Sequence, residues 1–225
     1  MKPTLYITPT PIGNYDDITL RALKVLKEVD FIFCEELKPA HRLLAHFNIS
    51  KELISLNEHN EKEIADEVIN KLLDGKTAAL ISDGGTPLFS DPGHYLVDLC
   101  ILNKIKIVPL PGANSLLPTL VSSGLDIENF YYYGWLSPKK EIRKQELLKL
   151  KKLNELIVIM ETPYRLKRLL TDIISFFGAD QKIVLAYKLT MDEENIFRDT
   201  ASNILKQVVK ENLKGEFVML LNNRK

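Results

Sequence analysis

Cysteine is scarce in this chain, and so are the other marks of a secreted or membrane protein. The 225 residues include two cysteines, Cys34 and Cys100, and both lie in apolar runs. Two such cysteines provide neither a disulfide framework nor a CxxC motif, so we expect two buried thiols in a reducing compartment. The N-terminal segment lacks the long apolar stretch of a signal peptide, and no apolar run approaches the roughly 20 residues that span a bilayer. We therefore expect a cytoplasmic protein that does not enter a membrane.

An excess of charge of either sign is also absent. The 30 lysines and arginines balance the 30 aspartates and glutamates. This balance argues against a histone-like polycation, but it leaves room for a local basic face that binds nucleic acid. Apolar residues make up 45% of the chain and charged residues 27%, as in ordinary globular proteins. The length suffices for one large domain or two compact ones.

Several common active-site motifs are missing. No GxGxxG follows the first predicted strand and no GxxxxGK[ST] occurs, which disfavours a Rossmann dinucleotide site and a P-loop. There is no GxSxG nucleophile elbow. The histidines do not form a metal-binding set, because His41 and His46 are five residues apart and fall on different helix faces. We therefore expect no metal site.

Short apolar strands alternate with amphipathic helical stretches along the first half of the chain. Predicted strands cover residues 5–7, 31–34, 53–56, 77–82, 105–110, 130–134, 155–160, 182–189 and 216–221, and predicted helices cover 20–28, 61–73, 94–103, 115–123, 139–152, 165–177 and 200–210. This alternation predicts an α/β fold, with a parallel sheet covered by helices on both faces. The pattern changes after Pro111-Gly112, so we predict an N-terminal α/β domain over 1–112 and a mixed-sheet C-terminal domain over 113–225.

Three loops rich in glycine and proline follow predicted strands of the first domain. They are residues 8–14 (TPTPIGN), 82–93 (SDGGTPLFSDPG) and 109–115 (PLPGANS). Ligands of open α/β sheets bind at the carboxyl ends of the strands, where these loops should converge. Glycine lets a ligand approach the backbone closely, and proline fixes the shape of a loop. One such loop alone would most simply be a tight turn, whereas three at one edge indicate a binding site.

In this order, the loops resemble those of the tetrapyrrole methylase superfamily of S-adenosylmethionine (SAM)-dependent methyltransferases. The chain is most similar to the ribosomal RNA small subunit methyltransferase I family. The similarity lies in residues 5–36, 78–93, 109–125, 132–144, 160–166 and 214–221. The resemblance implies a two-domain tetrapyrrole methylase-like fold with SAM in the cleft between the domains, usually as a homodimer. It also implies methylation of a cytidine ribose 2′-hydroxyl in 16S rRNA, within free RNA or the small ribosomal subunit.

The same resemblance suggests which residues contact the cofactor, largely through backbone groups. By their positions in the family motifs, these are Pro11, Gly84, Gly85, Thr86, Pro87, Phe89, Asn114, Ser115 and Glu161.

A base is expected to assist as the ribose hydroxyl loses its proton. Glu35, Asp83 and Glu161 are carboxylates at predicted strand ends, and Glu35 is the first choice for this catalytic role. For Asp83 and Glu161, shaping the loops or the SAM pocket is an equally good interpretation.

Basic residues near aromatic ones are candidates for RNA binding. They are Lys38, His41, Arg42, Lys139, Lys140, Arg143 and Arg165. Phosphate contacts and base stacking need these residue types. The alternative is that these groups are solvated faces of helices.

The chain departs from the family pattern at three places. The family typically has an acidic-Thr-Arg-His-Thr-Arg segment after the second strand, where residues 35–42 read EELKPAHR. A usual Arg-Glu-Leu-Thr-Lys becomes residues 187–191, YKLTM, and the sequence ends at Lys225 without the small helical domain of many members. These changes leave SAM binding intact as an expectation but put the RNA target in question. Two alternatives stay open: a tetrapyrrole-type small-molecule methylase, and a non-enzymatic RNA-binding module with a vestigial SAM pocket.

Overall fold

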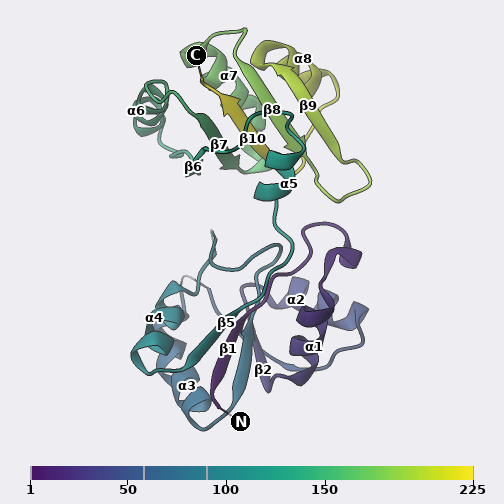
Figure 1. The fold of residues 1–225 in the computed structure, drawn as a ribbon, viewed down its shortest axis with the longest axis vertical. Coiled ribbons are helices and arrows are strands. Elements are labelled where there is room, and N and C mark those ends of the chain that lie inside the picture. The colour runs from purple at the N-terminus through teal and green to yellow at the C-terminus, as the bar shows by residue number, and fades with distance from the viewer. Residues whose placement is uncertain (1, 58, 90, 225) are drawn as a thin grey trace. The chain divides into compact units, whose positions relative to one another are not determined.

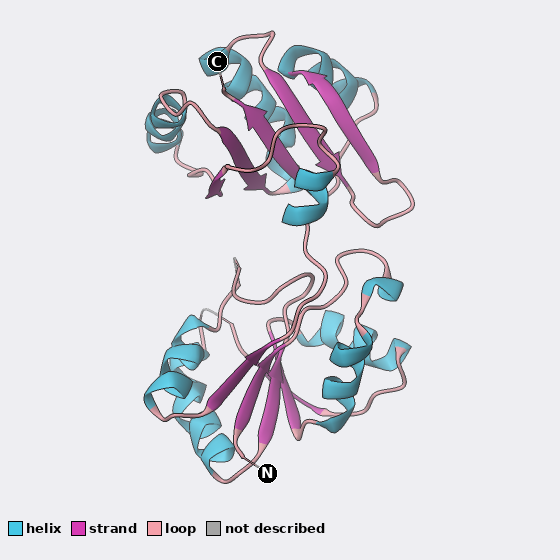
Figure 2. Ribbon diagram, viewed as in Figure 1, coloured by secondary structure: helices cyan, strands magenta, loops and turns pink. Residues whose placement is uncertain are grey.

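The computed structural model describes residues 2–57, 59–89 and 91–224. The chain divides into two compact units, residues 1–114 and 115–225, and this boundary lies two residues beyond the predicted one. Figure 1 labels the elements of each unit, and Figure 2 shows that each unit is built from one sheet and its flanking helices.

The first unit is a parallel sheet between two layers of helices. The sheet has five strands in the order β3-β2-β4-β1-β5. Its elements are β1 (Thr4–Ile7), α1 (Leu20–Glu28), β2 (Phe31–Cys34), α2 (Leu37–His46), β3 (Glu52–Ser55), α3 (Glu61–Leu73), β4 (Thr77–Leu80), α4 (His94–Leu102) and β5 (Lys106–Pro109), with a 3-10 turn at η1 (Tyr15–Asp17). Helices α1 and α2 pack on one face and α3 and α4 on the other, which confirms the predicted architecture (Figure 1).

The apolar run of β2 explains why both faces must be covered. All four of its residues are buried. Phe31 and Phe33 pack into the core beside α3 and α4, whereas Ile32 and Cys34 pack into the core beside α1 and α2. Successive side chains of a strand point to opposite faces, so a continuously apolar strand requires helices on both sides. Cys34 and Cys100 are buried free thiols, as predicted.

Helix α2 was not among the predicted helices. Its first turn contains Pro39, and the only buried residues are Ala40, Leu43 and Leu44. Proline is tolerated in the first turn of a helix because no intrahelical hydrogen bond is lost there. The 40, 43, 44 spacing is helical, but the charged residues around it made the apolar face too short to recognise.

The second unit is a mixed sheet, as predicted, with strand order β6-β7-β10-β8-β9. Strands β6 and β7 are parallel, and the other neighbouring pairs are antiparallel. Its elements are α5 (Leu116–Val121), β6 (Tyr131–Gly134), α6 (Lys140–Leu150), β7 (Leu156–Glu161), η2 (Pro163–Arg165), α7 (Leu166–Phe177), β8 (Lys182–Tyr187), β9 (Asn195–Thr200), α8 (Ala201–Lys210) and β10 (Phe217–Asn222). Helices α6, α7 and α8 cover one face, and α5 packs on the other.

Strand β9 was not predicted. It lies at the edge of the sheet, and Phe197 is its one buried residue. An edge strand that buries so little carries almost no apolar pattern in its sequence. Among the residues described in both units, no helix is long and apolar enough to cross a membrane.

Candidate active site

The three glycine- and proline-rich loops meet at the carboxyl edge of the first sheet. Thr10 and Gly85 join the first two loops as an isolated antiparallel bridge. The Thr86 hydroxyl donates to the carbonyl of Ala113 in the third loop over 3.2 Å. A Cβ atom on Gly112 would lie 2.6 Å from Pro9 Cβ, so the first and third loops also touch. The predicted convergence of the loops is therefore confirmed.

Strand order explains this convergence. The loops follow β1, β4 and β5, and β1 lies between the other two in the sheet. The hydrogen-bond ladder continues into the loops, because Thr8 N donates to Leu80 O over 2.9 Å and Leu110 N donates to Ile7 O over 3.0 Å. Parallel neighbouring strands end at the same edge of a sheet, so loops about a hundred residues apart in the chain begin next to one another.

The two adjacent glycines of the middle loop have different roles. Gly85 has φ +89°, where side chains are disfavoured, and its Cβ would lie 3.3 Å from Ile12 Cγ2. Its N–H and C=O are both bonded to Thr10. Gly84 is exposed, and its Cβ would make an ordinary 3.4 Å contact with Pro11 O. Gly85 thus holds the loops together, and Gly84 leaves the backbone beside Pro11 open to a ligand.

The other predicted cofactor residues divide between the two units. In the first unit, Pro11 and Pro87 are buried, Thr86 and Asn114 are half-buried and Phe89 is exposed. All of these lie on the three converging loops. Ser115 begins the second unit, where its carbonyl accepts a 2.7 Å hydrogen bond from Thr119 Oγ1 of α5. The contacts of these residues with a cofactor stay predictions.

Glu161 lies at the end of β7, inside the Glu-Thr-Pro-Tyr-Arg turn of the second unit. The residue is buried, with 3% of its surface exposed. One carboxylate oxygen accepts from Thr162 N over 2.9 Å, and the other accepts from Arg165 Nη1 over 2.7 Å. Arg165 also donates to Leu136 O over 3.2 Å. Both side chains therefore hold the turn in shape, and their predicted contacts with cofactor and RNA stay predictions.

Arg143 corrects the predicted RNA-binding set. Its side chain is only 6% exposed and pairs through Nε with Asp172 Oδ2 at 2.8 Å. Its Nη1 donates to the carbonyls of Ser137 and Pro138, each over 3.1 Å. The residue faces inward because it shares the buried side of α6 with Leu147 and Leu150. The 143, 147, 150 spacing is helical and was the overlooked signal.

The remaining basic candidates lie at the surface. Lys38, His41 and Arg42 are exposed on α2, and Lys139 and Lys140 are exposed at the start of α6. These residues are accessible to a polyanion, and their binding of RNA stays a prediction.

A cavity of about 130 Å³ adjoins the edge formed by the loops of the first unit. Its lining residues are Thr10, Pro11, Tyr15, Pro39, Ala40, Arg42, Leu43, Ser82 and Asp83. Asp83 Oδ1 accepts from Glu36 N over 3.3 Å. Partial burial raises the pKa of Asp83, the Glu36 N–H opposes that shift, and the Glu36 charge adds to it. Burial, followed by the charge of Asp83, also raises the pKa of Asp91.

Glu35, the predicted catalytic base, is half-buried after β2. Its carbonyl accepts a 3.1 Å hydrogen bond from Ser55 Oγ. The residue is not among those that line the 130 Å³ cavity. Its catalytic role stays a prediction.

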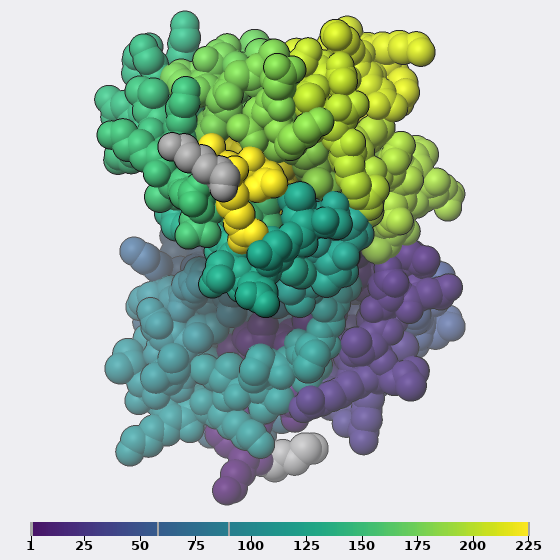
Figure 3. Space-filling view, turned by 45° about the horizontal axis from the view of Figure 1, so that its top comes forward, coloured from purple at the N-terminus to yellow at the C-terminus, as the bar shows by residue number. Residues whose placement is uncertain are grey.

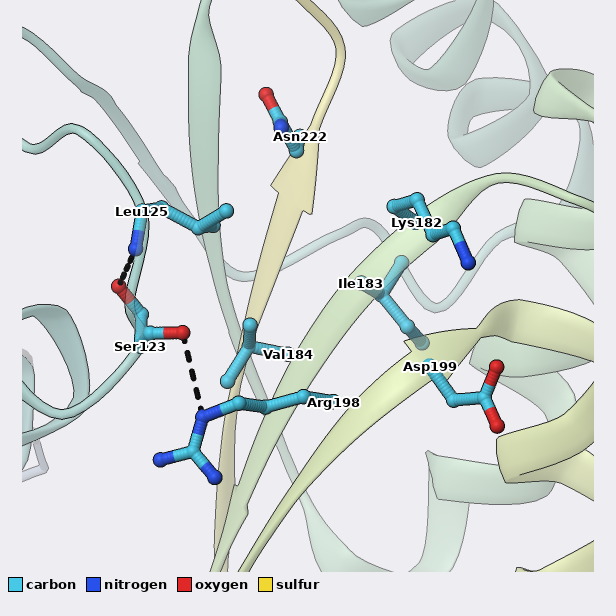
Figure 4. A pocket seen from close by; sticks show the side chains of 8 residues that line it. All are labelled: Ser123, Leu125, Lys182, Ile183, Val184, Arg198, Asp199 and Asn222. Atoms are coloured by element: carbon cyan, nitrogen blue, oxygen red, sulfur yellow. Dashed lines mark hydrogen bonds between the residues drawn. The ribbon is translucent and has the colours of Figure 1, made fainter.

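A second cavity, of about 220 Å³, lies in the second unit and contains none of the predicted site residues (Figure 4). Arg198 crosses it and donates through Nε to Ser123 O over 3.3 Å and through Nη2 to Ser122 O. Ser123 Oγ in turn accepts from Leu125 N over 3.0 Å. The arginine thus fastens the segment after α5 to β9, and we assign this cavity a structural role.

Comparison with known proteins agrees with the family suggested by the loops. The family model for tetrapyrrole (corrin/porphyrin) methylases matches residues 4–205. Ribosomal RNA small subunit methyltransferase I of Vibrio cholerae serotype O1 is 41% identical over 222 residues, which cover 98% of this chain and 77% of that protein. The protein of the same name from Escherichia coli O157:H7 is 39% identical and covers 98% of this chain and 78% of its own length. The Bacillus subtilis protein of this name is 38% identical, and the match covers 96% of this chain and 74% of that protein.

Solved structures share the fold at low sequence identity. A cobalt precorrin-4 methyltransferase matches with a TM-score of 0.73 at 17% identity, over 98% of this chain and 95% of its own. A diphthine synthase matches with a TM-score of 0.74 at 15% identity, over 97% and 89% of the two chains. Since the family model spans most of the chain and the relatives are 38–41% identical, the chain belongs to the tetrapyrrole methylase family, among the ribosomal RNA small subunit methyltransferase I proteins.

Proposed function

We propose that this protein transfers a methyl group from SAM to the ribose 2′-hydroxyl of a cytidine in 16S ribosomal RNA. The observation that carries the proposal is the meeting of three loops from β1, β4 and β5 at one sheet edge, tied by Thr10, Gly85 and Thr86. The names of the relatives at 38–41% identity supply the substrate class. This substrate would place the reaction in the cytoplasm.

The residues at the loop edge fit a cofactor of this kind. Gly84 presents exposed backbone beside Pro11, and Asp91 places a carboxylate near this edge, which suits a cationic sulfonium. A fold neighbour, uroporphyrin-III C-methyl transferase from Thermus thermophilus, was solved with S-adenosyl homocysteine; it has a TM-score of 0.65 at 14% identity and covers 98% of both chains. The bound cofactor supplies an already activated methyl group. The loops would therefore orient the two reactants and exclude water.

The RNA would contact exposed basic groups rather than a basic protein surface as a whole. Lys38, His41 and Arg42 project from α2 in the first unit, and Lys139 and Lys140 begin α6 in the second. Phosphate contacts of this kind make the affinity dependent on salt. Because total charge is balanced, we expect these local clusters to direct RNA binding.

Methyl transfer to purified small ribosomal subunits tests this function. Subunits from cells that lack the gene should accept labelled methyl groups from SAM, and large subunits should not. Nucleoside mass spectrometry of the product should find a 2′-O-methylcytidine that is absent from untreated RNA. Transfer to a precorrin-type compound but not to RNA would support the tetrapyrrole alternative. Absence of SAM binding in calorimetry would support the non-enzymatic alternative.

We also propose that the protein acts as a homodimer. Leu117 and Val121, one turn apart on α5, are 56% and 71% exposed. Figure 3 shows the chain around α5 (teal) at the surface of the second unit. Exposed apolar side chains of this kind often mark contact surfaces. Light scattering should give twice the chain mass, and Val121→Glu should lower it towards that of one chain.

A further inference from the structure

The 130 Å³ cavity beside the loop edge combines unlike groups in a small space. Pro11 and Pro39 give it apolar walls, while Arg42 and Asp83 give it a cation and an anion. Tyr15 also lines the cavity, and its ring contacts that of His46 at 4.4 Å between centroids. The cavity is smaller than the roughly 300 Å³ at which pockets for whole drug-sized ligands begin, so it would take one moiety of a larger substrate.

The opposite charges in this cavity do not neutralise each other. Among the residues the structure describes, Arg42 makes no ion pair within 4.0 Å, although Asp83 lines the same space. The Asp83 carboxylate accepts a hydrogen bond from a backbone N–H, that of Glu36, and not from Arg42. This arrangement suits a ligand that donates a hydroxyl hydrogen bond to the carboxylate of Asp83 and offers an anionic group to the guanidinium of Arg42.

A nucleotide within an RNA strand has this combination, because a ribose hydroxyl and a phosphate lie on either side of one sugar. Prolines provide a flat apolar surface for the sugar or the base. We infer that this cavity receives the ribose of the acceptor nucleotide, with its 2′-hydroxyl at Asp83 and a neighbouring phosphate at Arg42. The inference rests on the proposed function and adds to it the position of the substrate and the identity of the residue that accepts the hydroxyl proton.

Asp83 is next to Gly84, the position left open for the cofactor, so the hydroxyl would lie beside the methyl donor. As the ribose oxygen bonds to the methyl carbon, the carbon–sulfur bond breaks and the hydroxyl proton passes to the Asp83 carboxylate. The products are the ribose methyl ether, the neutral thioether and a protonated Asp83 that releases its proton to water. The raised pKa of Asp83 favours this role, since a more basic carboxylate accepts a proton more readily.

Three measurements on one set of variants test this inference: SAM affinity by calorimetry, affinity for small ribosomal subunits across salt concentrations, and the single-turnover rate of methyl transfer. The test variants are Asp83→Asn and Arg42→Ala. The matched controls are Asp66→Asn on α3 and Arg21→Ala on α1, which are exposed residues outside the cavity. Thermal unfolding checks that every variant is folded.

Asp83→Asn should bind SAM and subunits about as well as wild type, yet transfer methyl groups about a hundredfold more slowly. Arg42→Ala should bind subunits about tenfold more weakly, and its log–log salt dependence should lose about one unit of slope. Both controls should match wild type. A wild-type transfer rate in Asp83→Asn would overturn the inference and return Glu35 as the candidate base. Unchanged subunit affinity and salt slope in Arg42→Ala would overturn it as well, because no phosphate would then lie at Arg42. If wild-type protein transfers nothing to subunits, the proposed function itself is wrong.

Discussion

Thr10 and Gly85 exchange two backbone hydrogen bonds of 2.9 Å, one in each direction, between the loops that follow β1 and β4. Strands β1 and β4 are neighbours in the sheet, and this pairing continues their contact into the loops beyond the strand ends. It also occupies both backbone groups of a glycine that the sequence alone suggests as a cofactor contact. Structural and ligand-binding roles can therefore be separated experimentally between Gly84 and Gly85.

Valine at the two glycines should have different effects. Gly84→Val should keep wild-type stability and weaken SAM binding, because Gly84 has room for a Cβ but faces the open edge. Gly85→Val should also lose roughly 1–2 kcal/mol of unfolding free energy, since its φ of +89° disfavours a side chain. Urea unfolding and SAM calorimetry measure the two effects. Equal SAM affinity in wild type and Gly84→Val would contradict the proposed cofactor position.

Arg143→Ala should destabilise the protein rather than weaken RNA binding directly. The change leaves Asp172 and two carbonyls without their buried cation, which typically costs about 3 kcal/mol. The double variant Lys139→Ala/Lys140→Ala should keep wild-type stability and bind ribosomal subunits more weakly with a shallower salt dependence. Unfolding curves and filter binding on both variants check this. Wild-type stability in Arg143→Ala would show that the pair with Asp172 contributes little.

The difference in unfolding free energy between Asp83→Asn and the wild type should depend on pH. Burial raises the pKa of Asp83 in the folded protein above its ordinary value of 3.8, so folding favours the protonated form. That contribution is fully present below pH 3.8 and is lost as pH rises through the raised pKa. Asparagine does not ionise, so the variant should become more stable relative to wild type as pH rises. Urea unfolding between about pH 4 and pH 8 tests this, and a pH-independent difference would contradict it.

The two thiols should be unreactive in the folded protein. Burial raises the pKa of Cys34 to about 11, with a further contribution from the Asp83 charge. Burial alone raises the pKa of Cys100 to about 11. Since the thiolate is the reactive form, a disulfide reagent at neutral pH should modify neither residue until the chain unfolds. Rapid modification of native protein at Cys34 but not Cys100 would indicate that the region around β2 opens locally.

Strong local patterns allowed much of the fold to be predicted. Helices α1 and α3 and strand β2 lie at their predicted bounds because each has a clear apolar face or run. Helix α2 and strand β9 were missed because their buried residues are few and are separated by charged ones. Convergence of the three loops was predictable because a parallel sheet brings strand ends to one edge.

What the sequence could not reveal is how each side chain within the site is used. A basic helix predicts Arg143 and Lys140 equally as RNA contacts, yet only the helical phase, set by packing, places one inside and the other outside. Likewise, Glu35 and Asp83 both follow apolar strands, and their sequences do not show which of them lines a cavity. Those distinctions depend on tertiary packing rather than on local pattern.

The strand order β4-β1-β5 also has a consequence during synthesis of the chain. Strand β1 pairs with strands that begin at Thr77 and Lys106, so it leaves the translating ribosome before either neighbour has been synthesised. A nascent chain that ends before β5 would also lack the third loop at residues 109–115. Growing chains should therefore not be retained on an immobilised analogue of SAM before that loop has emerged from the ribosome.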